Sequence, residues 1–184
     1  ALKVGDRVAL EPGVVCGKCE QCLSGKYNLC EHVEFFATPP YHGVFANYVK
    51  HPENLCFKLP DNVSNMEGAL VEPLAVGLHA ASQGDVKLGD TVVVFGAGCI
   101  GLVSMLASKA RGASKVYVVD IIDKRLAFAK KLGATEVINA KNEDVLTKID
   151  ALTEGKGAHV VIETAGSPIT IGQTASVLRK AGTV

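Results

Sequence analysis

The sequence lacks an excess of charge of either sign, because 19 lysine and arginine residues balance 19 aspartate and glutamate residues. It also has no run of basic residues, so we expect neither a nucleic acid nor a membrane as a partner. Glycine or a charged residue interrupts every apolar run well short of a membrane span. Low-complexity linkers and internal repeats are absent as well. What remains is a chain of 184 residues, 48% hydrophobic and 21% charged, which is the composition of a globular protein.

Cysteine is the most informative residue type that is present. Four of the six cysteines form a cluster, with two residues between each of the first three and seven before the last: Cys16, Cys19, Cys22 and Cys30. Thiolates are soft ligands that suit tetrahedral zinc, and residues 16–22 can bring three sulfurs round one point only by turning tightly. A closed shell of four sulfurs leaves no position for water. We therefore predict a structural zinc, with an iron–sulfur cluster, disulfides or scattered thiols as the alternatives.

The redox state of the thiols depends on the compartment. Nothing resembling a secretory signal opens the chain, and the dinucleotide motif described below is typical of intracellular proteins. We therefore expect reduced thiols and a cytoplasmic location. Cys56 and Cys99 stand outside the cluster in apolar stretches, where we expect buried, inert thiols.

The first part of the chain has the pattern of short strands and turns. We expect strands over residues 4–11, 44–50 and 56–59, bounded by prolines and by the cysteine loop. The pattern then changes, because Ser64 and Glu67 form a capping box ahead of an apolar series with helical spacing. A helical segment is predicted from that point, with Pro73 kinking or restarting it.

From Thr91 onward, strand and helix patterns alternate strictly. The expected strands cover residues 92–95, 115–119, 137–139 and 159–163, and the expected helices cover residues 100–111, 124–132, 145–152 and about 169–180. A further strand is expected to begin at Gly182. Such alternation predicts an α/β fold with a doubly wound parallel sheet and helices on both faces.

A Gly-x-Gly-x-x-Gly turn follows the first of these strands and opens the next helix: Gly96, Ala97, Gly98, Cys99, Ile100 and Gly101. The first glycine allows a tight turn, the second lets the backbone approach a pyrophosphate, and the third lets the helix pack on the strand. The helix N-terminus supplies free amides and positive potential. Because Asp120 follows nineteen residues after the last glycine, the context that the motif requires is complete. We predict that this turn binds a dinucleotide, with a purely structural tight turn as the alternative.

Asp120 indicates which dinucleotide binds. A carboxylate at this position can accept hydrogen bonds from the adenosine ribose and would repel a phosphate on that ribose, so NAD is favoured over NADP. Arg125, five residues on, would soften this preference if it joined the cofactor site, although it is equally consistent with solvated charge on a helix. Residues 164–166, Thr-Ala-Gly, are either a backbone segment that passes close under a cofactor or a plain loop.

Several motifs occur in an order that resembles the zinc-dependent medium-chain alcohol dehydrogenase superfamily over the whole chain. Besides the cysteine loop and the glycine turn, they are Gly-Asp-Arg-Val at 5–8, Leu-Pro-Asp-Asn-Val at 59–63 and Glu-Pro-Leu at 72–74. Residues 35–40 and 68–77 are most similar to the polyol dehydrogenases of sorbitol and xylitol type. Butanediol dehydrogenases share much of the second segment and are less similar in the first.

The resemblance implies a two-domain enzyme. Residues 1–82 would form a partial GroES-like catalytic domain with the structural zinc lobe, and residues 83–184 an NAD-binding Rossmann domain. A homo-oligomer, either a dimer or a tetramer, is implied as well. In this superfamily a second zinc binds the alcohol oxygen as a Lewis acid, lowers its pKa and lets hydride pass to the nicotinamide ring.

Three further side chains gain a role from the resemblance. Glu72 matches a position beside the second zinc, where it would ligate the metal or hold the metal-bound water. It lies in an apolar stretch, where an unpaired glutamate would be costly, and helix capping is the alternative role. Phe35 and Phe36 match the region of an aromatic residue that walls the substrate site of polyol enzymes, although adjacent phenylalanines are also typical of a core.

The other ligands usual for the second zinc, a cysteine and a histidine–glutamate pair, have no visible equivalents in this chain. We therefore expect an internal fragment that stops before the last strand of the nucleotide fold. Two hypotheses follow. The chain is part of an NAD-dependent, zinc-containing polyol dehydrogenase that oxidises a secondary hydroxyl to a ketose and is inactive as this fragment alone, or it is a zinc- and NAD-binding module without catalysis.

Overall fold

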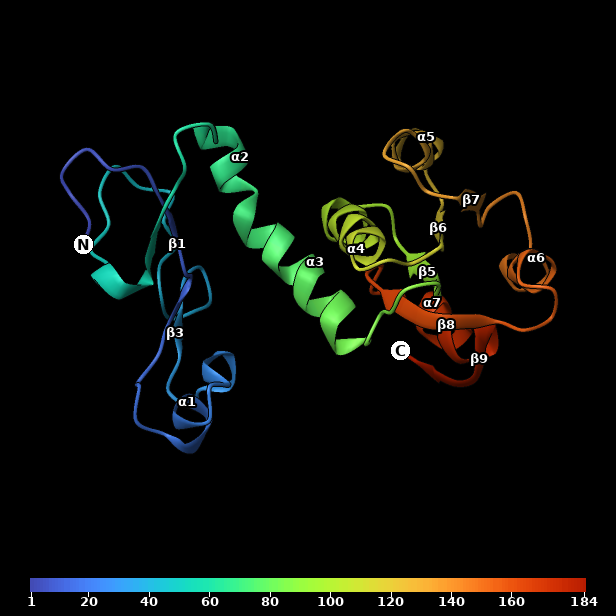
Figure 1. Cartoon of the computed structure of the whole chain (residues 1–184), viewed down its shortest axis with the longest axis horizontal. Helices are drawn as coiled ribbons and strands as arrows, with labels where there is room; N and C mark the ends of the chain where they lie inside the picture. Colours follow the sequence, from blue (N-terminus) through green and yellow to red (C-terminus); the bar gives the residue numbers. More distant parts are fainter. The chain divides into compact units, whose positions relative to one another are not determined.

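The computed structural model describes residues 1–184 and divides them into two compact units, Ala1–Glu72 and Pro73–Val184 (Figure 1). The division falls inside helix α3 (Val71–Gln83), so the helix begins in the first unit and lies mainly in the second. The boundary expected after residue 82 corresponds to the last turn of this helix. No helix of the protein combines the length and the apolar character needed to cross a membrane.

The first unit is built on two short antiparallel strand pairs. Strand β1 (Val8–Leu10) pairs with β4 (Cys56–Lys58), and β2 (Gly13–Val14) pairs with β3 (Glu34–Phe35). Between them lie α1 (Glu20–Leu23) and the 3-10 turns η1 (Tyr27–Leu29) and η2 (Glu53–Leu55). Arg7 donates hydrogen bonds to the backbone carbonyls of Pro60, Asp61 and Val63, so this charged side chain fastens the start of β1 to the segment before the helices.

Two strand predictions in this unit need correction. The strand expected over residues 4–11 forms only over Val8–Leu10, because Gly5 has a φ of 95°, in the left-handed region, and ends the extended run. Residues 44–50 form no strand at all, and Phe45 and Tyr48 are almost fully exposed. An extended segment is stable as a strand only when a neighbouring strand takes up its backbone hydrogen bonds, and none lies beside this one.

The capping box predicted from the sequence is confirmed. The Ser64 hydroxyl accepts from the Glu67 amide at 3.2 Å, and the Glu67 carboxylate accepts from the Ser64 amide at 2.8 Å, at the start of α2 (Asn65–Ala69). A new helix, α3, starts at Val71, so Pro73 falls in its first turn, where a missing amide costs no hydrogen bond. The proline is therefore accommodated at a restart of the helix.

The second unit contains a five-stranded parallel sheet of order β7-β6-β5-β8-β9 (Figure 1). Its strands are β5 (Thr91–Phe95), β6 (Lys115–Asp120), β7 (Glu136–Asn139), β8 (Ala158–Glu163) and β9 (Leu178–Thr183). The helices between them are α4 (Cys99–Ala110), α5 (Asp123–Lys131), α6 (Val145–Leu152) and α7 (Pro168–Thr174). This confirms the predicted α/β fold, a small β unit followed by a doubly wound sheet.

The core of the second unit has two layers because alternate residues of a buried strand face opposite sides. On one side Val92 and Val94 pack with Met105 of α4 and Leu126 of α5. On the other side Val93, Phe95 and Tyr117 pack with Ile149 of α6. Helices therefore cover both faces, and only the edges of the sheet and the strand ends stay open.

The last predicted helix is also wrong in its second half. Helix α7 ends at Thr174, a 3-10 turn η3 (Ala175–Val177) follows, and Leu178–Thr183 forms β9 where the helix was expected to continue. Strand β9 pairs in parallel with β8, with an irregular register between Ala158 and Val160. Pairing with the exposed edge of β8 thus outweighs the helix propensity of the Leu-Arg-Lys-Ala segment.

Candidate functional site

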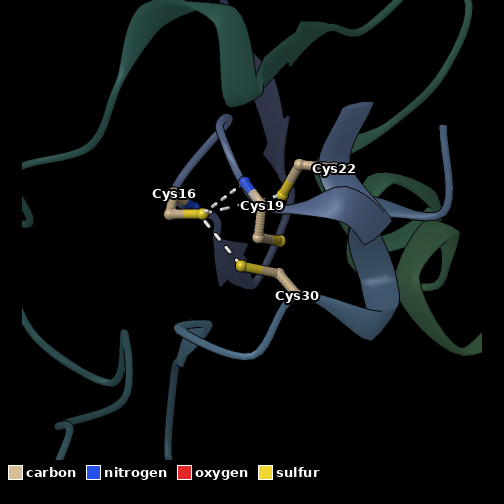
Figure 2. Close-up of side chains that lie close together, drawn as sticks. All are labelled: Cys16, Cys19, Cys22 and Cys30. Carbon is tan, nitrogen blue, oxygen red and sulfur yellow. Dashed lines mark hydrogen bonds between the residues drawn. The ribbon is translucent and has the colours of Figure 1, made fainter. Parts of the chain in front are cut away.

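The four clustered cysteines gather at one place in the first unit (Figure 2). Cys16 follows β2, Cys19 and Cys22 flank and occupy α1, and Cys30 ends η1. All four sulfurs lie within 4.8 Å of one another, and none is in a disulfide. The short turns α1 and η1 therefore bring the four sulfurs together, as the sequence spacing predicted.

This geometry fits zinc. Ligands at about 2.3 Å from a tetrahedral zinc are separated by about 3.8 Å, and the Cys16 and Cys22 sulfurs are 4.0 Å apart. Backbone amides of Cys16 and His32 donate to the Cys30 sulfur, and the Cys19 amide donates to the Cys16 sulfur, each at 3.4 Å. Hydrogen bonds from the backbone amides of Lys18 and Cys19 lower the pKa of the Cys16 thiol to about 6. A thiolate held by amides is the form that binds metal.

The glycine turn lies between β5 and α4, where the sequence placed it. Gly96 has a φ of 97°, and a Cβ there would approach the Thr164 hydroxyl to 2.7 Å. A Cβ on Gly101 would collide with the Gly96 carbonyl, so this glycine is required for helix and strand to pack. Around Gly98, in contrast, a Cβ would meet nothing within 4 Å. Open space at the middle glycine is what a pyrophosphate approaching the helix N-terminus needs.

Asp120 lies at the end of β6, with its side chain only 6% exposed. Its Oδ1 accepts the amides of Ile121 and Ile122 at 2.7 and 2.9 Å. Its Oδ2 accepts the amide of Ala97 in the glycine turn at 2.7 Å and lies 3.9 Å from Arg125 Nη1. The carboxylate is therefore anchored beside the turn and keeps acceptor capacity on Oδ2, while the guanidinium, 53% exposed, stands next to it.

Sequence reasoning missed the part played by Glu163 at the end of β8. Its carboxylate accepts the amides of Ala165 and Gly166 and the hydroxyl of Thr170, which fixes the loop that was expected to pass near a cofactor. Thr164 in this loop donates to the Phe95 carbonyl at 2.7 Å, directly before the glycine turn. The only available signal was an acidic residue at a strand end, which is common.

These loops meet at one edge because β5 and β8 are adjacent and parallel. The chain proceeds from β5 to β6 and β7 on one side and to β8 and β9 on the other, so the glycine turn and residues 164–166 flank the point where the strand order reverses. Open α/β sheets bind ligands in the crevice at such a point.

Other predicted site residues are not brought together. Glu72 is exposed in the first turn of α3, so the argument from a buried, unpaired carboxylate is wrong, and no other potential metal ligand is grouped with it. Phe35 is 39% exposed and packs beside Gly13, whereas the ring of Phe36 lies 5.0 Å from that of His51. Cys99 is exposed rather than buried, and it is the first residue of α4, directly after Gly98.

Comparison with known families gives two matches along the chain. Residues 1–61 match the alcohol dehydrogenase GroES-like domain, and residues 99–184 match the zinc-binding dehydrogenase domain. The first match contains the cysteine cluster. The second begins inside the glycine turn at Cys99 and includes the rest of the sheet, so each contains one of the two sites described above.

Similar proteins include a zinc-type alcohol dehydrogenase-like protein of Escherichia coli, 51% identical over 99% of this chain, and others named for D-xylulose and sorbitol. A protein from Aspergillus clavatus with the name "Probable D-xylulose reductase A" is 49% identical over 100% of this chain, and the sorbitol dehydrogenase of Bacillus subtilis is 45% identical over 98%. The alignments cover 52% and 51% of those two proteins. The chain therefore spans about half the length of the curated relatives that it matches.

Solved structures of dehydrogenases are also similar to this chain. An oxidoreductase/dehydrogenase of unknown specificity from Escherichia coli has a TM-score of 0.96 and 51% identity, covering 98% of this chain and 52% of that one. A zinc-binding dehydrogenase from Sinorhizobium meliloti bound to NADP has a TM-score of 0.91 and 31% identity, covering 100% of this chain and 54% of that one. With both domain types present in sequence order and the cysteine lobe and glycine turn formed, the chain belongs to the zinc-containing medium-chain alcohol dehydrogenase superfamily.

Proposed function

We propose that this chain supplies the zinc lobe and the nucleotide-binding fold of an NAD-dependent polyol dehydrogenase, which oxidises a secondary hydroxyl of a sugar alcohol such as sorbitol or xylitol to the ketose. The observation that carries the proposal is the glycine turn with Asp120 anchored beside it. The polyol class is supported by the relatives named for sorbitol and D-xylulose.

The proposed preference for NAD over NADP rests on the negative charge of Asp120. A phosphate on the adenosine ribose would meet the Asp120 carboxylate, which is buried and therefore poorly screened. Arg125 approaches the same oxygen only at 3.9 Å and is mostly solvated, so it offsets that repulsion incompletely. The similar structure bound to NADP makes this preference worth testing directly.

The cysteine cluster is proposed to hold a structural zinc through Cys16, Cys19, Cys22 and Cys30. Four thiolates complete a tetrahedral shell, so the metal would have no free position for a substrate. Its contribution is to keep α1 and η1 folded on each other, since this lobe buries only one of the four cysteines, Cys30, and has little core of its own.

For a second, catalytic zinc the residues of this chain do not make a site. Glu72 is exposed, and the one group of potential ligands that lie close together is the cysteine cluster. We keep Glu72 as the candidate residue of the catalytic centre, with Phe35 and Phe36 as candidates for the substrate wall, and derive no step through a metal there. When bound, such an ion would supply Lewis acidity toward the alcohol oxygen.

What this chain would do in the reaction is hold the cofactor. The glycine turn and the first amides of α4 would bind the pyrophosphate, and Asp120 would hold the adenosine ribose. The loop fixed by Glu163 flanks the same crevice and would limit where the nicotinamide half can lie. We also propose a cytoplasmic location and a homo-oligomer, either a dimer or a tetramer. Light scattering on the purified protein tests the oligomeric state.

The test is binding followed by turnover. Titration of the protein with NADH and NADPH, followed by cofactor fluorescence, should give tighter binding of NADH. Sorbitol, xylitol and 2,3-butanediol are then supplied with NAD, and NADH formation is followed at its absorbance maximum. Oxidation of butanediol but of neither polyol would assign the protein to another secondary alcohol. Dinucleotide binding without any turnover would favour a non-catalytic zinc- and NAD-binding module.

A further inference from the structure

A cavity of about 530 Å³ lies at the edge of the sheet opposite the glycine turn. It is formed where β5, β6, β8 and β9 begin, together with the loop that joins α6 to β8. Because parallel strands have all their amino ends at one edge, this cavity and the nucleotide crevice are separated by the length of the strands. The dinucleotide fold makes no use of it.

The lining of this cavity is strongly basic, although the protein as a whole has no net charge. Its charged side chains are Lys115, Lys156, Arg179 and Lys180 against the single carboxylate of Glu154. That carboxylate is already paired with Lys156 at 2.9 Å. Lys156 and then Lys115 lower the pKa of the Glu154 carboxyl, so that carboxylate offsets part of the Lys115 charge as well. Lys180 forms no ion pair or hydrogen bond through its side chain.

The pair formed by His159 and Arg179 also lacks an acceptor. The Thr91 amide donates to His159 Nδ1 at 3.0 Å, so that nitrogen carries no proton and the neutral ring must carry its proton on Nε2. Nε2 in turn lies within hydrogen-bond distance of Arg179 Nη1, which is always a donor. The nearest carboxylate oxygen to Nε2, on Asp90, is 3.9 Å away, and the other oxygen of that carboxylate accepts the Lys87 amide. Neither Arg179 nor His159 Nε2 therefore has a carboxylate oxygen within hydrogen-bond distance.

We propose that this cavity binds a small multivalent oxyanion of the phosphate type. The anion would accept from Arg179 and from His159 Nε2, and Lys115 and Lys180 would balance its charge. A planar guanidinium suits two oxygens of one phosphate, and an unpaired ammonium group adds attraction without a fixed geometry. The basic walls would also concentrate anions locally.

The experiment uses the whole chain with inorganic phosphate and pyrophosphate as probes. Binding is measured by isothermal titration calorimetry at constant ionic strength, for the unchanged protein and for Arg179→Gln and Lys115→Gln. Lys131→Gln on α5 is the matched control, since it removes the same charge from an exposed position outside the cavity. We expect each cavity variant to weaken binding about tenfold, as the loss of one charge-assisted hydrogen bond or ion contact would, and the control to leave it unchanged.

Competition with NADH separates this site from the glycine turn. If phosphate binds in the cavity, saturating NADH leaves its affinity unchanged. If NADH displaces the phosphate, the anion sits at the helix N-terminus of the nucleotide site and the proposal is wrong. Equal weakening in all three variants would likewise overturn it, because that result indicates attraction by net charge alone. Since the readout is anion binding, failure here is distinguishable from failure of the proposed dehydrogenase activity.

Discussion

The backbone amide of Ala97 donates a 2.7 Å hydrogen bond to Oδ2 of Asp120 and thereby joins the glycine turn to the end of β6. Twenty-three residues separate the two in sequence. The carboxylate that is proposed to select the cofactor thus also holds the turn that is proposed to bind it. Cofactor choice and the shape of the turn are therefore coupled through one side chain.

We expect Asp120→Ala to weaken NADH binding by about tenfold or more, because the ribose loses a charged acceptor and the turn loses its anchor. NADPH binding should fall much less, since the repulsion between the carboxylate and the ribose phosphate disappears as well. Titrations monitored by cofactor fluorescence measure both. Asp85→Asn, at an exposed position paired only with Lys87, is the control. Equal losses of affinity for the two cofactors would mean that Asp120 does not distinguish the ribose of NADH from the phosphorylated ribose of NADPH.

Two glycines of the turn should respond differently to alanine. Gly101→Ala forces a methyl group against the Gly96 carbonyl and should destabilise the protein by about 1–3 kcal/mol. Gly98→Ala has open space and a φ of −75°, so the fold should keep its stability while the new methyl group blocks the pyrophosphate. Urea unfolding and NADH titration of both variants test this. A Gly98→Ala variant that binds NADH normally would contradict the assigned position of the pyrophosphate.

Removing a cysteine of the cluster should remove the metal. Cys19→Ser and Cys30→Ser are expected to lose stoichiometric zinc and to become less stable, because metal binding and folding of the lobe are linked. Cys56→Ser is the control, since its sulfur donates to the Pro52 carbonyl and lies outside the cluster. Elemental analysis after exhaustive dialysis and a thermal melt give the two readouts. Retention of one zinc per chain in both cluster variants would refute the shared site.

The exposed thiol of Cys99 gives an independent probe of the crevice. Because it lies in the first turn of α4 beside Gly98, a bound dinucleotide should shield it from alkylation. We expect saturating NADH to slow labelling of Cys99 by iodoacetamide several-fold in the zinc-loaded protein, as followed by peptide mass spectrometry. Cys56 should label at the same rate with and without NADH. If the Cys99 rate is also unchanged, the pyrophosphate does not cover this turn.

The sequence alone was sufficient to predict the features that depend on interactions within one short segment. The spacing of Cys16, Cys19 and Cys22 predicts convergence on one ion, and the capping box at Ser64 predicts the start of α2, because each depends on neighbours a few residues away. The alternation from Thr91 to Glu163 predicts a parallel sheet since buried strands and amphipathic helices have different hydrophobic periods.

Tertiary structure decided the features that depend on distant partners. Residues 44–50 have a strand-like pattern but form no strand, because no other strand lies beside them. Residues 178–180 were predicted as helix but belong to strand β9, because the edge of β8 offers hydrogen bonds. The exposure of Glu72 and of Cys99, the bond from Ala97 to Asp120 and the meeting of His159 with Arg179 have the same origin. Each depends on which groups the completed fold brings together, and local spacing carries no information about that.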